Sequence, residues 1–221
     1  MKKNWWKILC VVLILFSLVA GLLIPVPDLP IVHQSIRNLF FHVGMWFAML
    51  VIFTISFIYS IRYLSDFKTD NDIVAQEASK VGVFFGILGI VTGMIWAKFT
   101  WGSWWVNDPK LNGAAVSLLV YFAYLVLRNS LNEEQKRAKV SAVYNIFAYV
   151  LLIVFIGILP RLAQGSIHPG DTSNPLTIGA LDNNLRLVFY PAVVGWILLA
   201  VWILELKVKI YKLERKINSY D

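Results

Sequence analysis

Six long apolar runs, separated by short polar segments, dominate the chain. Each run has about the ~20 residues that an α-helix needs to cross the hydrocarbon core of a bilayer. The pattern predicts an all-α fold, a polytopic integral membrane bundle of six transmembrane helices, in a single domain over residues 1–221. The predicted spans are Trp5–Ile24, Leu39–Leu64, Val81–Ala97, Leu111–Leu127, Val143–Leu159 and Leu187–Leu206.

Composition supports a membrane protein. Hydrophobic residues make up 58% of the chain and charged residues 15%, whereas about a quarter of a typical soluble domain is charged. The net charge of +7 could indicate nucleic acid, but in so apolar a chain basic residues more often mark cytoplasmic loops. We therefore expect contact with membrane lipid and no nucleic-acid partner.

The basic residues also predict an orientation. Fifteen of the 20 Lys and Arg residues lie in the N-terminal segment, the loops after the second and fourth spans, and the C-terminal tail. Because cytoplasmic loops carry the excess of Lys and Arg, both termini are predicted to be cytoplasmic. The segments 25–38, 98–110 and 160–186 are then on the outer face.

All three histidines fall on that outer side: His33, His42 and His168. For His33 and His168, in loops, the default interpretation is a solvated side chain. His42 lies about one turn inside the second span, with Trp46 one turn further along the same face. A polar ring inside a membrane helix costs free energy unless it has a partner, so His42 is a functional candidate.

Tryptophans gather on the same side, in the stretch WGSWWVNDPK at 101–110. An interfacial belt explains isolated tryptophans such as Trp96, but three in five positions of a polar connector favour a platform for a large planar ligand. Haem fits this set, since its iron takes histidine and its two propionates favour Arg or Lys. Arg37 and Lys110 are the nearest cations in sequence to His42 and to the tryptophans.

The stretch resembles the WGxWWxWDxR signature of the haem-handling proteins of cytochrome c biogenesis, a superfamily that includes CcmC, CcsA and CcmF. The six-span outline is similar to the CcmC family, the haem-delivery proteins of cytochrome c maturation. The segments RNLFFHV at 37–43 and SIHPG at 166–170 resemble two further motifs of that family. The chain departs from the pattern at Asn107, at Lys110 and at Pro169.

The resemblance implies a protein that holds non-covalent haem b and delivers it to a CcmE-like haem chaperone. It implies partnership with an ABC-type CcmA/CcmB complex and a small CcmD-like subunit, in the bacterial inner membrane with the functional face periplasmic. The implied axial ligands are His42 and His168, the implied platform is Trp101, Trp104, Trp105 and Asp108, the polar contacts are Arg37 and Lys110, and Trp46 is a weaker candidate.

Three other functions fit the sequence less well. A cytochrome c synthase of the CcsA type shares the tryptophan motif but normally has more spans and more membrane histidines. A small-solute permease is disfavoured because no charged residue lies at the middle of a predicted span. A transmembrane cytochrome b would need histidines in the inner halves of facing helices, and no histidine lies in the inner half of any predicted span. No catalytic constellation is present in the sequence, so we do not expect an enzyme.

Overall fold

The computed structural model describes residues 4–28, 32–162 and 181–218, and in these residues it is helical with no strand. Six segments are long and apolar enough to cross a membrane, which confirms the all-α prediction. The elements are α1 (Trp5–Leu23), the 3-10 helix η1 (His33–Asn38), α2 (Leu39–Asp66), α3 (Thr69–Trp101), α4 (Pro109–Asn129), α5 (Glu134–Leu152), the π-helix η2 (Ile153–Ile158), α6 (Leu159–Leu162) and α7 (Asn183–Ile217).

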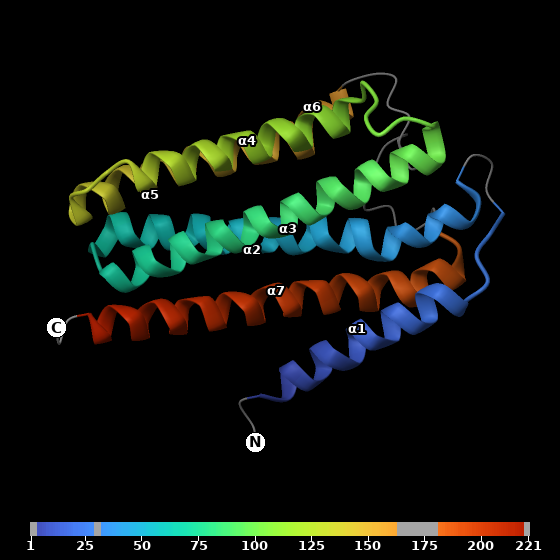
Figure 1. Cartoon of the computed structure of the whole chain (residues 1–221), viewed down its shortest axis with the longest axis horizontal. Helices are drawn as coiled ribbons and strands as arrows, with labels where there is room; N and C mark the ends of the chain where they lie inside the picture. The colour runs from blue at the N-terminus through green and yellow to red at the C-terminus, as the bar shows by residue number, and fades with distance from the viewer. Residues whose placement is uncertain (1–3, 29–31, 163–180, 219–221) are drawn as a thin grey trace.

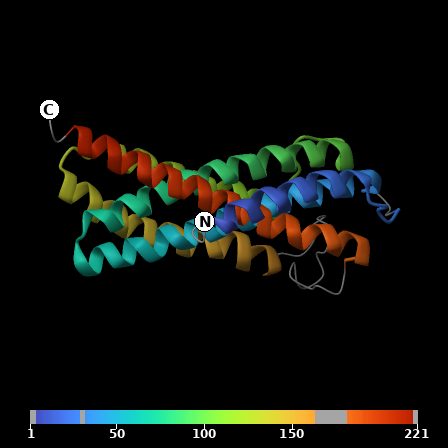
Figure 2. The ribbon, with the colours of Figure 1, turned by 90° about the horizontal axis from the view of Figure 1, so that it is seen from below.

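The helices α2 and α3 run antiparallel through the middle of the bundle, with α7 and α1 on one side and α4 and α5 on the other (Figure 1). In both views the α1–α2 and α3–α4 connectors gather at one end, which we call the tryptophan end (Figures 1 and 2). The α2–α3 turn, the α4–α5 turn and the C-terminus lie at the other, which we call the basic end. The described parts of the three predicted outer segments therefore belong to one end of the bundle.

Several helices extend well beyond the predicted apolar spans. The third span was predicted from Val81, whereas α3 begins at Thr69, so the predicted loop after the second span is largely helical. Likewise α5 begins at Glu134 rather than Val143. Hydropathy detects only the part of a helix that suits hydrocarbon, and here charged turns continue each helix past it. Asp70 and Asp72, in the first turn of α3, suit the positive end of the helix dipole.

A stripe of glycines on α3 fixes its register against α2. Small residues let membrane helices approach closely, and a Cβ at any of these glycines would lie only 2.5–3.0 Å from an α2 side chain. The residue numbers of each facing pair have the same sum, so the two helices stay in register over three turns. The pairs are His42 with Gly93, Trp46 with Gly89, Met49 with Gly86 and Phe53 with Gly82.

On its other side α2 packs against α7. The Trp196 indole covers Gly44, where a Cβ would lie 2.4 Å from the ring, and its Nε1 donates to the Phe40 carbonyl at 3.0 Å. The tryptophan end of α2 is therefore held between α3 and α7.

Candidate functional site

His42 lies in the first turn of α2, at the tryptophan end, with its imidazole directed at α3. Its Nδ1 is 3.0 Å from the Gly89 carbonyl oxygen and 3.1 Å from the Thr92 hydroxyl. The side chain of Asn38, one turn earlier, donates to the Thr92 carbonyl at 3.0 Å. These hydrogen bonds join the start of α2 to one turn of α3. They also give the His42 imidazole hydrogen-bond partners inside the bundle.

Two indoles flank the imidazole. The ring centroids of Trp46 and Trp96 lie 6.1 and 5.7 Å from that of His42, and both contacts are edge-to-face. Trp96 comes from α3, and its Nε1 donates to the Ser35 hydroxyl of η1 at 3.0 Å. Membrane anchoring does not account for these contacts, because this indole also forms one wall of the His42 environment.

Sequence reasoning missed Gly89, Thr92 and Trp96 as well as the tight contact at Gly93. A signal for them exists in the sequence, since these α3 positions follow helical spacing and lie on one face. What the sequence could not supply is the partner helix. Only the register of α3 against α2 directs that face at His42.

The tryptophan stretch begins on α3 and crosses to α4. Trp101 ends α3, and Gly102 follows with φ +75°, a left-handed conformation that glycine adopts at a helix C-terminus. Trp104 and Trp105 are exposed at 54% and 37%. The Trp105 indole donates to the Asn112 side chain of α4 at 3.2 Å, so this ring is tied to the start of that helix.

The departure at Asn107 has a local role. The Asn107 side-chain oxygen accepts from the Asn112 amide at 2.8 Å, and the same Asn112 side chain binds Trp105. An asparagine in place of the usual tryptophan thus removes a ring from the stretch but contributes a hydrogen bond that holds it.

Asp108 is almost fully buried, at 1% exposed, and caps the N-terminus of α4. Its Oδ1 accepts from the backbone N–H of Lys110 at 2.8 Å, and Pro109 fills the first helical position, where no amide is needed. Asp108 therefore has a structural function that is independent of any ligand.

The Arg37 side chain is directed at α1. Its Nη1 donates to the Gly21 carbonyl at 2.8 Å and its Nε to the Gln34 side chain at 3.0 Å, so it joins η1 to the end of α1.

His33 is exposed and bonds Asp28 through Nδ1 at 2.9 Å. The prediction for His168 lies outside the described residues. The structure thus brings His42, Trp46 and Trp96 together but does not bring Arg37 onto the α3 side of His42.

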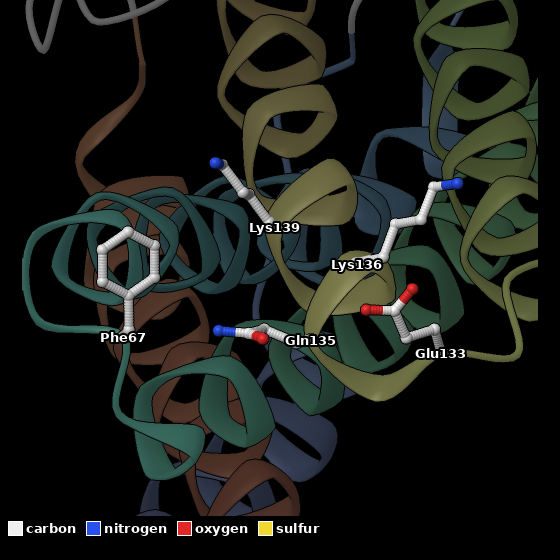
Figure 3. Close-up of a pocket in the computed structure, with 5 residues that line it drawn as sticks. All are labelled: Phe67, Glu133, Gln135, Lys136 and Lys139. Atoms are coloured by element: carbon white, nitrogen blue, oxygen red, sulfur yellow. The ribbon is translucent and has the colours of Figure 1, made fainter.

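At the basic end, a cavity of about 440 Å³ opens between the α2–α3 turn and the start of α5. Figure 3 shows its lining residues: Phe67, Glu133, Gln135, Lys136 and Lys139. It lies at the opposite end from His42. Among the described residues, no group of three or more His, Cys, Asp or Glu side chains could hold a metal ion.

The fold and the site define a class: a six-helix integral membrane protein with a histidine held inside the bundle beside a tryptophan-rich end. The family model described as heme exporter protein C, CcmC, matches residues 2–220. The chain belongs to the CcmC family, which supports a haem-handling role in cytochrome c biogenesis.

Relatives named cytochrome c biogenesis protein CcsA match a shorter segment. One from Prochlorococcus marinus subsp. pastoris is 39% identical over 87 residues, which is 39% of this chain and 27% of the relative. One from another Prochlorococcus marinus strain is 40% identical over 80 residues, 34% of this chain and 25% of the relative. A Synechococcus relative is 37% identical over 87 residues, 39% of this chain and 27% of the relative. The matches thus span less than a third of these relatives' length.

Proposed function

We propose that this protein holds haem b non-covalently at the outer face of the bacterial inner membrane and delivers it to a CcmE-like haem chaperone. Haem is its cargo, and the protein works with an ABC-type CcmA/CcmB complex and a CcmD-like subunit. Both termini face the cytoplasm, and the tryptophan end faces the periplasm. In this proposal His42 and His168 are the axial ligands of the haem iron.

One observation carries the proposal: Nδ1 of a histidine within the bundle lies 3.0 Å from a backbone carbonyl oxygen, which can only accept a hydrogen bond. Histidines that ligate metals almost always donate their other ring N–H in this way. The His42 environment also suits a flat apolar macrocycle, since Trp46 and Trp96 present broad rings beside the imidazole. The residues present therefore fit haem.

The tryptophan stretch is the proposed platform. Trp104 and Trp105 expose ring surface at the same end of the bundle as His42, and Trp101 links them to α3. The buried cap at Asp108 and the bond from Trp105 to Asn112 hold the stretch in a fixed shape. A fixed, exposed aromatic surface suits a cargo that must be both bound and released. Lys110 and Arg37 are the proposed contacts for the propionates, Arg37 through N–H groups other than the two that bond Gly21 and Gln34.

The test is the absorption spectrum of the purified protein with haem. Two histidine ligands give a low-spin spectrum, so wild type should be low-spin, and His42→Ala should turn high-spin or lose haem. His168→Ala should do the same. His33→Ala is the matched control, because His33 is an exposed histidine bonded to Asp28, and it should leave the spectrum unchanged. An unaltered spectrum in His42→Ala overturns the ligand assignment.

A second function is favoured by the names of the relatives: direct participation in attaching haem to the apocytochrome, as in a CcsA-type synthase. Membranes that contain this protein with an apocytochrome, with and without the chaperone, separate the two. Delivery requires the chaperone for any haem transfer. Transfer without it would favour the synthase.

A further inference from the structure

We infer that Thr92 is a positioning residue which, with the Gly89 carbonyl, holds His42 in the tautomer that presents Nε2 to the haem iron. The inference rests on the proposed function and extends it to residues of a second helix. The observation behind it is the pair of contacts at Nδ1, 3.0 Å to the Gly89 oxygen and 3.1 Å to the Thr92 hydroxyl oxygen.

The Gly89 contact decides which nitrogen carries the proton. A carbonyl oxygen can only accept a hydrogen bond. If Nδ1 of His42 were unprotonated, two lone pairs would face each other at 3.0 Å inside an apolar bundle, where an unmade hydrogen bond is costly. Nδ1 is therefore the donor. In the neutral ring the lone pair is then on Nε2, the nitrogen that can bind a metal.

The Thr92 hydroxyl acts in the same direction. It has one proton, which it donates within its own helix, to the Leu88 carbonyl at 2.8 Å or to the Gly89 carbonyl at 3.1 Å. Its oxygen is left to accept from His42. Thr92 thus adds a second acceptor for Nδ1–H. The hydrogen bond of the Thr92 hydroxyl to the α3 backbone holds this acceptor in place.

Packing holds the ring in this orientation. Trp46 and Trp96 contact it edge-to-face, and a Cβ at Gly93 would lie 2.7 Å from its Cε1. Rotation of the imidazole about its Cβ–Cγ bond would carry it away from both acceptors and into these neighbours. Orientation and tautomer are therefore set together by one face of α3.

This arrangement should influence the bound iron. A hydrogen bond donated from Nδ1–H raises the basicity of the ligating nitrogen, and loss of such an outer partner typically weakens metal binding by roughly 10–100-fold. A more basic imidazole favours the ferric over the ferrous ion. Removing the Thr92 acceptor should then raise the midpoint potential of the bound haem and weaken its retention.

The first measurement needs no haem. Nitrogen NMR of the apo protein labelled with ¹⁵N-histidine, with the His42 signals assigned from His42→Gln, distinguishes the protonated from the unprotonated ring nitrogen. We expect a protonated Nδ1 and an unprotonated Nε2 at His42. The opposite tautomer overturns the inference, whatever the protein does with haem.

The second measurement uses haem-loaded protein with three variants. Thr92→Val keeps the shape but removes the acceptor, and we expect about a tenfold loss of haem affinity, the lower end of the range because Gly89 remains, together with a raised midpoint potential. Thr92→Ser restores the hydroxyl and should restore both. Thr54→Val is the matched control, because Thr54 also bonds the carbonyl four residues back, at 2.8 Å, but contacts Tyr149 rather than His42.

The outcomes separate this inference from the proposed function. If Thr92→Val has the wild-type potential, or changes no more than Thr54→Val, Thr92 has no positioning role. If His42→Ala keeps the wild-type spectrum, the proposed ligand itself is wrong. A low-spin wild type, a changed His42→Ala and a serine rescue at position 92 together support both.

Discussion

Asp72 and Arg128 form a two-pronged ion pair between the start of α3 and the end of α4. The guanidinium donates to both carboxylate oxygens, at 2.8 and 2.6 Å, and the two residues are only 7% and 3% exposed. A third bond reaches the Gln76 side chain at 2.8 Å. This pair joins the centre of the bundle to the α4–α5 layer at the basic end.

Breaking this pair should be costly. Arg128→Leu leaves the Asp72 carboxylate buried without its main partner, and such loss typically costs about 3–5 kcal/mol. Thermal unfolding in detergent should show a large fall in stability, and Asp72→Leu combined with Arg128→Leu should recover most of it. The control is Lys212→Ala, which breaks the exposed pair with Asp70 and should cost less than about 1 kcal/mol. Equal losses in Arg128→Leu and Lys212→Ala would contradict the prediction.

Gly82→Ala should separate α3 from α2. The new Cβ would lie 2.5 Å from the Phe53 ring, and overpacking of this kind costs about 1–3 kcal/mol. Unfolding measurements should show this loss of stability in Gly82→Ala. They should show that part of the stability is recovered when Phe53→Leu is added. Gly157→Ala is the control, because the nearest side-chain atom to its new Cβ is 3.8 Å away. No difference between the two alanine variants would show that the close approach is not required.

The buried cap at Asp108 predicts a difference between two substitutions. Asp108→Ala removes the acceptor for the Lys110 amide and should cost about 1 kcal/mol, while Asp108→Asn keeps an acceptor and should be nearly neutral in unfolding. If Asp108 also belongs to the haem platform, Asp108→Asn should lower haem retention at unchanged stability. Normal retention in Asp108→Asn would leave the residue with its capping role alone.

Trp104→Ala combined with Trp105→Ala should reduce haem retention and transfer to the chaperone. Each lost stacking contact removes on the order of 1 kcal/mol, so two amount to roughly a tenfold loss or more. Haem occupancy and chaperone-bound haem are measured in membranes with equal amounts of each variant. Trp5→Ala is the control, because Trp5 is an exposed tryptophan at the N-terminal position of α1, outside the tryptophan stretch. Normal delivery by the double variant would identify the stretch as an interfacial belt.

Reporter fusions should establish the orientation. A periplasm-dependent reporter joined after Ser103 should be active, whereas the same reporter after Asn132 should be inactive, because the two sites lie at opposite ends of the bundle. The positive-inside rule assigns the tryptophan end to the outside. Activity at both sites would rule out the proposed topology.

Much of the fold could be predicted from hydropathy, because a bilayer demands about 20 apolar residues per crossing whatever the rest of the chain does. The same reasoning identified His42, since a polar ring in an apolar run is conspicuous. Contacts between helices could not be predicted. Thr92 and Trp96 come within reach of His42, and Asp72 within reach of Arg128, only through packing that one sequence does not encode in any local pattern.

The register between α2 and α3 also implies that docking of these two helices comes before the His42 tautomer is fixed. An imidazole on a lone inserted helix exchanges freely between its two tautomers, because nothing accepts from one nitrogen in preference to the other. Once α3 docks through its glycines, the Gly89 carbonyl selects one form. It follows that the Nε2 lone pair of His42 is fixed in one direction only after this helical hairpin has closed, so under the proposed function the hairpin must form before the protein reaches its full haem affinity.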